Sequence, residues 1–406
     1  MQLKLLNFHK VLSQFSSNIV GAFIALIIYQ STGSFTYAFL FLVVSMMLRI
    51  LITRLFYNLM TKKPQIFLAI RLIPFCLYSL ALLLLDTPYI VLGIILSTIF
   101  YAFSVSFKDI PMELVFSYST VNKGASSNGL SRLFEYIGVI SAIILGGLFL
   151  DNLPKIYCII ISCGAYLISV IPLVVYYFLQ KNSKGFNREV VSNAVESFKD
   201  IKIKQHQQEV ISKKILIRYF IIYVLFCAYD GLMPTLSLYL FNMSAESYSF
   251  VSYIQAGFYA MFGVGCFVAG KLDERKDLTR IVMINCLLSA CLVIATPFVY
   301  EYIWLEVAMY SVIGFLYAFI SIFVYSRMMM RCKIMGIGNK ALYNRTKAGR
   351  CSQAIVYLIA SISPVMFIPA IIIAGLMFGS CTVAIPINEE KTRKILVDYL
   401  QNNKMY

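Results

Sequence analysis

Ionisable side chains stand inside several long apolar segments of this sequence. Asp230 lies about 15 residues from one basic flank of its segment and about 11 from the other end, which at about 1.5 Å per helical residue is close to the middle. Gly231 and Pro234 beside it would loosen a helix there. A carboxylate in this position could carry protons or could pair with a buried arginine, and both roles stay open.

Two further sites of charge follow the same reasoning. Glu135 and Arg132 are three residues apart and share a helix face, so Glu135 is either neutralised by Arg132 or a second proton-coupling candidate. Arg49 lies about nine residues, or about 13 Å, from the basic end of its segment, so we expect it to face a polar interior and to pair with an acid. It could bind an anionic substrate or hold the bundle together. Arg71 should extend to the water, and Glu306 should be interfacial.

Uncharged polar residues in the apolar segments suggest a central cavity. Gln14 and Asn18 are four residues apart and lie on one helix face. Gln255, Asn285 and Gln353 stand in three later segments. A cavity lined by such groups and by aromatic side chains would suit amphipathic organic molecules.

The elements that position these residues are membrane-spanning helices. Of 406 residues, 60% are hydrophobic and only 13% are charged, whereas a soluble domain carries about a quarter charged. Runs of about 20 apolar residues, the length of a span, recur throughout. We predict an all-α membrane protein with helices over 11–30, 35–58, 65–85, 88–107, 128–150, 155–180, 215–241, 247–271, 279–300, 302–326, 348–367 and 368–387.

The distribution of charge predicts the orientation. The net charge of +16 comes from basic blocks between spans, as in loops facing an anionic cytoplasmic leaflet, and we expect no nucleic-acid partner. These blocks are Lys62 with Lys63, Lys108 with Lys123, Lys181–Lys214, Lys271 with Arg275 and Lys276, and Arg327–Arg350. Among the opposite connections, Lys155 is the single basic exception. We therefore expect a multi-pass protein of the cell membrane with both termini cytoplasmic.

The longest polar stretch divides the chain. We expect a six-helix bundle over residues 1–180, a cytoplasmic linker over 181–214, a second six-helix bundle over 215–388 and a cytoplasmic tail over 389–406. The first apolar segment has no small-residue cleavage site and is expected to be retained.

Enzyme chemistry has little support in the sequence. The ten cysteines are scattered without a CxxC pair, and only two histidines occur, so we expect no metal and no cofactor. A phosphate-binding Gly-x-x-x-x-Gly-Lys-Ser/Thr loop is absent, which argues against ATP hydrolysis by this chain.

Short motifs make the resemblance to a family specific. The segment Tyr29-Gln30-Ser31-Thr32-Gly33-Ser34 leaves the first helix, after a basic N-terminal segment with Leu6–Phe8. Between the eighth and ninth helices, Gly270, Asp273, Glu274 and Arg275 resemble a Gly-x-x-x-Asp-Arg loop, with Glu274 in the Asp position. The chain thereby resembles the major facilitator superfamily, in particular its macrolide-efflux and related drug:proton antiporters.

Other family positions depart from the pattern. Asn58 and Arg54 replace the Asp and Gly of the corresponding loop in the first half, and Ser17-Asn18 stands where relatives often have Gly-Asp. On the fifth helix the small residues keep the spacing of an antiporter motif, but Ala142-Ile143 replaces its Gly-Pro. These small residues, Gly138, Gly146 and Gly147, would also serve close helix packing.

The resemblance implies a major facilitator fold and alternating access to a central pathway lined by the first, fourth, seventh and tenth helices. It implies proton-coupled efflux of an amphipathic small molecule, with protons and the lipid bilayer as further partners. Nutrient uptake and a lipid flippase or degenerate accessory protein remain alternatives, and the substrate and the oligomeric state stay open. The proton-coupling candidates are Asp230 and Glu135, and the candidate cavity residues are Gln14, Asn18, Arg49, Tyr229, Gln255 and Tyr310.

Overall fold

The protein is a bundle of long helices. A computed structural model describes residues 2–120, 124–182, 213–244, 247–275, 278–299, 302–334 and 338–362, with short pieces between 371 and 385. No strand occurs in these residues. The elements are α1 (Gln2–Gly21), α2 (Ile24–Thr32), α3 (Phe35–Lys62), α4 (Pro64–Ile70), α5 (Leu72–Ala81), the 3-10 turn η1 (Leu82–Asp86), α6 (Ile90–Thr120), α7 (Gly124–Asn152), α8 (Lys155–Asn182), α11 (Lys213–Met243), α12 (Tyr248–Arg275), α13 (Thr279–Ala295), η2 (Thr296–Phe298), α14 (Ile303–Ile334) and α15 (Gly338–Ile362).

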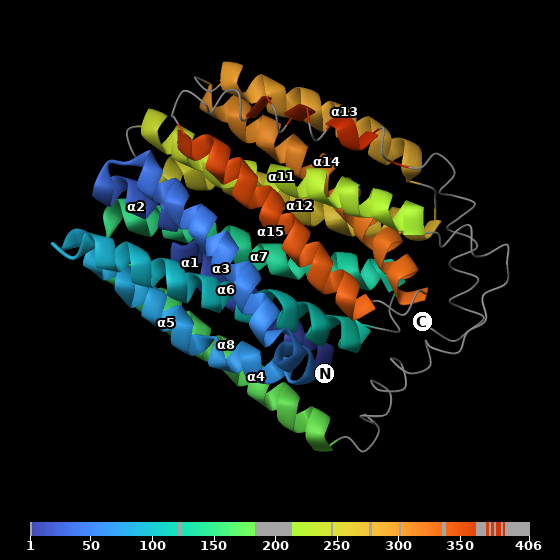
Figure 1. Ribbon diagram of the computed structural model, residues 1–406, viewed down its shortest axis with the longest axis horizontal. Helices are drawn as coiled ribbons and strands as arrows, with labels where there is room; N and C mark the ends of the chain where they lie inside the picture. The colour runs from blue at the N-terminus through green and yellow to red at the C-terminus, as the bar shows by residue number, and fades with distance from the viewer. Residues whose placement is uncertain are drawn as a thin grey trace.

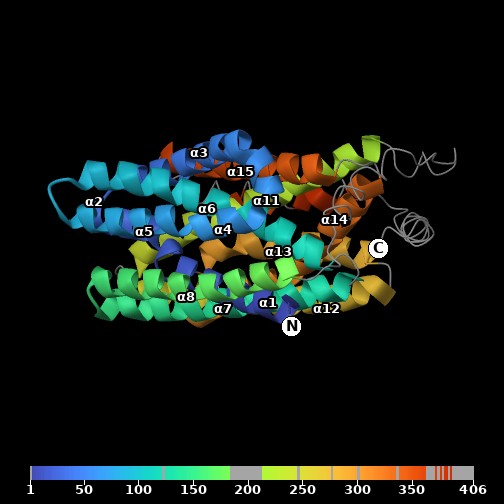
Figure 2. The same cartoon turned by 90° about the horizontal axis from the view of Figure 1, so that it is seen from below.

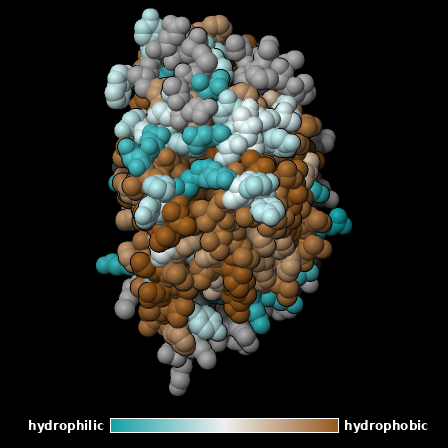
Figure 3. Space-filling view, turned by 90° about the vertical axis from the view of Figure 1, so that its left-hand side faces the viewer, coloured by the Kyte–Doolittle hydropathy of each residue, from teal (hydrophilic) through white to brown (hydrophobic). Residues whose placement is uncertain are grey.

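Within the described residues, nine helical segments are long and apolar enough to cross a membrane. Large apolar side chains on their outer faces are exposed, for example Leu55 on α3 and Ile171 on α8. Figure 3 shows a broad apolar area on one face of the molecule, with hydrophilic residues gathered above it. The predicted all-α membrane fold is confirmed. The predicted linker, the C-terminal tail and most of the twelfth span, 368–387, lie outside the described residues.

The helices form two groups that lie side by side (Figures 1 and 2). We call α1–α8 the first bundle and α11–α15 the second bundle. The most extensive packing between them is that of α7 against α12, α3 against α15, and α2 against α11. Functional side chains on these helices can therefore meet across the boundary between the bundles.

The two ends of the molecule differ in charge. We call the end that carries Lys62 and Lys63 the basic end, and the end that carries Asp86 and Asp151 the acidic end. The exceptional Lys155 lies at the acidic end, where its Nζ is 2.7 Å from Asp86 Oδ1. This basic exception is thus neutralised locally.

Several helices extend further than the sequence predicted, and two of these extensions place charged residues inside helices. Helix α6 continues to Thr120 instead of ending near residue 107, and α15 begins at Gly338 instead of near residue 348. Lys108, Arg345 and Arg350, which were assigned to basic connections or to a helix start, therefore lie within helices. Their charged groups have polar partners inside the protein, so the helices need not end before them.

The first span is interrupted and ends in the expected turn. Helix α1 is separated from α2 around Phe23, whose φ of −110° and ψ of 3° are not helical. Gly33 closes α2 with φ 65°, a left-handed conformation that favours glycine. The Thr-Gly-Ser turn that the sequence predicts therefore has its glycine where the backbone is left-handed.

The glycines of α7 allow close helix packing. A Cβ at Gly138 would collide with the Val11 backbone oxygen of α1, and one at Gly146 would collide with the Ile19 backbone oxygen. A Cβ at Gly147 would lie 2.7 Å from the Ser252 side chain of α12. The packing interpretation of these small residues is confirmed. Through them α7 packs closely against α1 in its own bundle and against α12 in the second bundle.

We expect Gly138→Ala to destabilise the protein by about 1–3 kcal/mol, because the new methyl group forces α1 and α7 apart. Gly164→Ala on α8 is the matched control, since a Cβ there meets nothing within 4 Å. Thermal unfolding of the purified protein in detergent measures both. Equal unfolding temperatures for the two variants would show that the α1–α7 contact does not depend on this glycine.

Candidate functional site

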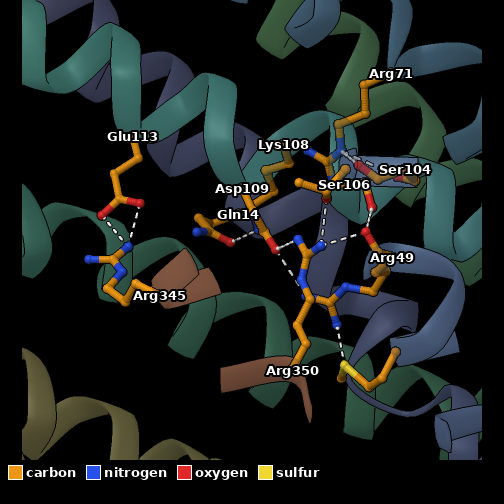
Figure 4. Close-up of polar contacts among 12 residues, drawn as sticks. Gln14, Arg49, Arg71, Ser104, Ser106, Lys108, Asp109, Glu113, Arg345 and Arg350 are labelled. Atoms are coloured by element: carbon orange, nitrogen blue, oxygen red, sulfur yellow. Dashed lines mark hydrogen bonds and ion pairs between the residues drawn. The ribbon is translucent and has the colours of Figure 1, made fainter. Parts of the chain in front are cut away.

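A cluster of charged and polar side chains lies between the two bundles (Figure 4). Helix α6 supplies three of its members, Lys108, Asp109 and Glu113, within two turns. Their positions bring them within reach of α1, α3 and α15. The cluster is therefore built by helices from both bundles.

Asp109 joins two arginines from opposite bundles. Its Oδ2 lies 2.9 Å from Arg49 Nη2 on α3 and 3.0 Å from Arg350 Nη2 on α15. Arg350 Nη1 donates to the Arg49 backbone oxygen and to Thr53 Oγ1, each at 2.6 Å. The expectation that Arg49 pairs with an acid is confirmed. The side chain of Asp109 remains 30% exposed although it lies deep in the bundle.

A second ion pair crosses between the bundles one turn nearer the basic end. Arg345 Nη2 donates to both carboxylate oxygens of Glu113, each at 2.5 Å. The Arg345 guanidinium also lies 4.8 Å from the ring centre of Tyr325 on α14. With Arg350, this pair connects α15 to α6 at two successive positions.

Glu135 collects three donors within the first bundle. Its carboxylate is 2.8 Å from Lys10 Nζ and 3.4 Å from Arg132 Nη1, and it accepts a hydrogen bond of 2.6 Å from Gln14 Nε2. The Gln14 amide oxygen accepts from Lys108 Nζ at 2.6 Å. The neutralisation of Glu135 by Arg132 is confirmed, and Lys10 adds to it. Gln14 links this group to α6.

The structure corrects the expectation that Arg71 extends to the water. Only 1% of Arg71 is exposed. Its Nε donates to the Ser104 carbonyl and hydroxyl oxygens, Nη1 donates to Ser13 Oγ at 3.0 Å, and Nη2 donates to Ser17 Oγ at 2.6 Å. The ring of Tyr166 lies 4.9 Å from the guanidinium. The serines on α1 and α6 give the side chain an inward alternative to the membrane surface.

At the acidic end, the described contacts that join the bundles are hydrogen bonds and not ion pairs. Tyr29 Oη on α2 donates to Asn242 Oδ1 on α11 at 2.7 Å. Tyr248 Oη on α12 donates to Gln30 Oε1 at 2.7 Å. Asp151 of α7 accepts from the backbone N–H groups of Tyr248 and Ser249, each at 2.8 Å, and so caps the N-terminus of α12.

The remaining candidates are spread over the molecule. Asn18 is half-buried and donates to the Gln14 backbone oxygen at 2.7 Å, while Gln255 Nε2 donates to Ser237 Oγ on α11 at 2.7 Å. Tyr310 is buried on α14, one turn from Glu306. Glu306 lies in the first turn of α14, where it is buried within the protein, and its oxygens have no hydrogen-bond partner in the described part of the chain.

The conformational-loop residues, the cavity candidate Tyr229 and the proton-coupling candidate Asp230 are less fully placed. Gly270 is buried near the end of α12. The side chains of Asp273, Glu274, Arg275, Tyr229 and Asp230 lie outside the described residues, although their backbones belong to α12 and α11. Their predicted roles stay predictions.

Sequence reasoning missed Asp109, Glu113, Arg345 and Arg350. Asp109 and Glu113 follow an apolar run and flank Pro111, which reads as the end of a helix. The usable signal was their spacing of four residues, which places two carboxylates on one face of a continued helix. The partner arginines show a five-residue spacing on α15.

Two helical bundles joined around a buried polar centre are the architecture of a membrane carrier. The chain belongs to the Major Facilitator Superfamily, whose family model matches residues 10–344. It is a multi-pass transporter of this superfamily, in which the two bundles surround the substrate path. A search of curated protein sequences finds no match to this chain.

Solved structures support the fold. The E. coli fucose:proton symporter is 13% identical, with a TM-score of 0.57 over 94% of this chain and 97% of that chain. A bacterial homologue of the iron transporter ferroportin is 12% identical in each of two states. Its inward-facing structure gives a TM-score of 0.67 over 93% of this chain and 98% of that one, and its outward-facing structure 0.60 over 94% and 100%.

We expect Asp109→Asn to destabilise the protein by about 2 kcal/mol or more, because two buried guanidinium groups lose their shared anion. The matched control is Asp86→Asn, which removes a carboxylate paired with Lys155 at the surface and should cost less than about 1 kcal/mol. Thermal unfolding in detergent compares the two. A loss at position 109 no larger than at position 86 would contradict the central role of this contact.

Proposed function

We propose that this protein exports amphipathic small molecules in exchange for protons, by alternating access. The observation that carries the proposal is the arrangement of the contacts between the bundles. Ion pairs join them at the polar centre and on its basic side, whereas hydrogen bonds without ion pairs join them at the acidic end. Alternate breaking of these two sets would open the centre first to one side of the membrane and then to the other.

The ion pairs toward the basic end and the hydrogen bonds at the acidic end are suited to separate control. Toward the basic end, Arg350 and Arg345 on α15 hold Asp109 and Glu113 on α6. At the acidic end, the Tyr29 and Tyr248 hydroxyls hold their partners without any change of charge. A charged ligand or proton in the centre would therefore act first on the ion-paired end. The ferroportin homologue of similar fold has been solved facing inward and facing outward.

Proton coupling would use carboxylates of the centre. Glu135 is held by Lys10, Arg132 and Gln14, and its protonation would release two cations and change the charge beside Lys108. Asp230 on α11 remains the candidate in the second bundle, from its position in the middle of an apolar segment. With one such carboxylate in each bundle, protonation would bias the position of the two bundles relative to each other.

The substrate would be amphipathic because apolar rings lie beside the charged centre. Tyr136, next to Glu135 in sequence, stacks on Tyr259 of α12 with ring centres 5.7 Å apart. Phe262 lies 4.9 Å from Tyr136 and 5.5 Å from Tyr317. Export as the direction, and drug-like molecules as the cargo, are supported by the resemblance of the first-helix exit and the loop after α12 to the efflux branch.

The test is proton movement in inside-out membrane vesicles that contain the protein. A pH-sensitive dye should report release of an imposed proton gradient when amphipathic compounds are added, and Asp230→Asn should abolish the release. Survival of the release in Asp230→Asn and its loss in Glu135→Gln would assign the coupling to Glu135. Asp86→Asn, which alters an exposed carboxylate, is the control and should behave as the unmodified protein.

An absence of release across macrolides, lipophilic cations, amphipathic carboxylates and amphipathic peptides, with protein correctly inserted, would contradict proton-coupled export. Accumulation of a tested compound by intact cells that contain the protein would instead favour uptake. The two preparations together decide the direction.

A further inference from the structure

The polar centre holds more cations than anions. Four cationic side chains, those of Arg49, Arg71, Lys108 and Arg350, share the centre with the carboxylate of Asp109 (Figure 4). The other carboxylate near Lys108, that of Glu135, is already paired with Lys10 and Arg132 and is not counted here. The surplus is three positive charges. The neighbouring cross-bundle pair of Glu113 and Arg345, in contrast, contains one charge of each sign, as a purely structural contact would.

Arg71 is the most deeply buried member of this surplus. Its described hydrogen bonds go to serine oxygens and occupy three of the five guanidinium N–H groups, and the uncharged Tyr166 lies beside it. Serine oxygens orient the guanidinium but bring no negative charge to it. A cation kept in this way inside a membrane protein is costly, and such groups mark substrate paths by default.

Lys108 has spare donors and can be reached. Its described polar contact is with the neutral Gln14 amide oxygen at 2.6 Å, which uses one of three N–H groups. Arg71 and Arg49 lie close enough to repel the ammonium, while Asp109 and Glu135 attract it. The residue is only partly buried, so a solute that enters the centre can contact it.

Arg49 and Arg350 share one oxygen of Asp109, and the Nε atoms of both are buried without an acceptor in the described structure. Only 3% of the Arg350 side chain is exposed. The two guanidinium groups therefore keep unused donors in the same centre. Guanidinium groups and lysine are the side chains that proteins use to hold carboxylate and phosphate groups.

We propose that the substrate carries an anionic group, a carboxylate or a phosphate, which is held by Lys108 and Arg71 beside the Arg49–Asp109–Arg350 contact. The inference rests on the proposed transport function and names the substrate class of its central site. The anion supplies the negative charge that the cluster lacks. It also competes with Asp109 for Arg350, so its arrival weakens a contact between the bundles.

The test measures the charge preference of the site directly. All ten native cysteines are replaced, and Lys108→Cys is introduced into the full chain in inside-out vesicles. The labelling rate with a sulfonate-bearing methanethiosulfonate reagent is divided by the rate with a trimethylammonium-bearing one of similar size. Lys63→Cys at the exposed basic end calibrates the ratio, since it makes the same change of residue on the surface.

We expect the anionic-to-cationic ratio at Lys108→Cys to be at least tenfold that at Lys63→Cys. Adding Arg71→Gln should lower the ratio, whereas Arg54→Gln, the same loss of charge on an exposed side chain, should leave it unchanged. If Arg71→Gln does not fold, the ratio at Lys108→Cys alone decides.

Equal ratios at the two positions, a preference for the cationic reagent, or no labelling of Lys108→Cys while Lys63→Cys reacts would each overturn the proposal. The labelling reports charge and access whether or not protons are exchanged. Failure of proton exchange with a high labelling ratio would therefore reject the antiport mechanism and keep the anion site. Proton exchange together with a low labelling ratio would keep the antiport mechanism and reject an anionic substrate.

Discussion

One carboxylate oxygen shared by two arginines determines how the bundles meet. Asp109 on α6 neutralises part of the charge of Arg49 on α3 and of Arg350 on α15, and Arg350 also donates to the α3 backbone. Without the carboxylate, the two guanidinium groups would repel each other in a place with little water to screen them. The packing of α3 against α15 thus depends on an ion contact that a competing anion or a proton can weaken.

The two ends of the molecule differ in the physics of their contacts. The acidic end is joined by hydrogen bonds of tyrosine hydroxyls and by Asp151 at the N-terminus of α12. The ion pairs toward the basic end depend on the charge state of the centre, whereas the tyrosine hydrogen bonds do not. Gly147 of α7 also lets Ser252 of α12 approach closely near the acidic end, about one turn from the Asp151 cap.

Much of the fold could be predicted because membrane spans have a strong signal in composition and length. The charged centre was harder. Arg49 could be assigned an acidic partner from its depth, but the identity of the acid could not, because Asp109 lies beside Pro111 and reads as the start of a loop. Arg71 was misassigned because depth alone favours snorkelling, and only the fold brings the serines of α1 and α6 around it. Long-range contacts of this kind leave no local pattern.

The most direct test of alternating closure locks one end of the molecule and measures how accessible the other end becomes. In a chain without native cysteines, Tyr29→Cys and Asn242→Cys are joined by a short bis-methanethiosulfonate reagent, which forms a reducible disulfide with each cysteine and locks the acidic end. A third cysteine replaces Thr53 and is kept chemically masked until the lock has formed, after which it is unmasked for labelling. It reports access from the basic end, because Thr53 is buried under Arg350. Alternating closure predicts that the lock raises the labelling rate at Thr53→Cys several-fold, and that cutting the cross-link by reduction restores the original rate. A rate that is unchanged or lowered by the lock would contradict the account.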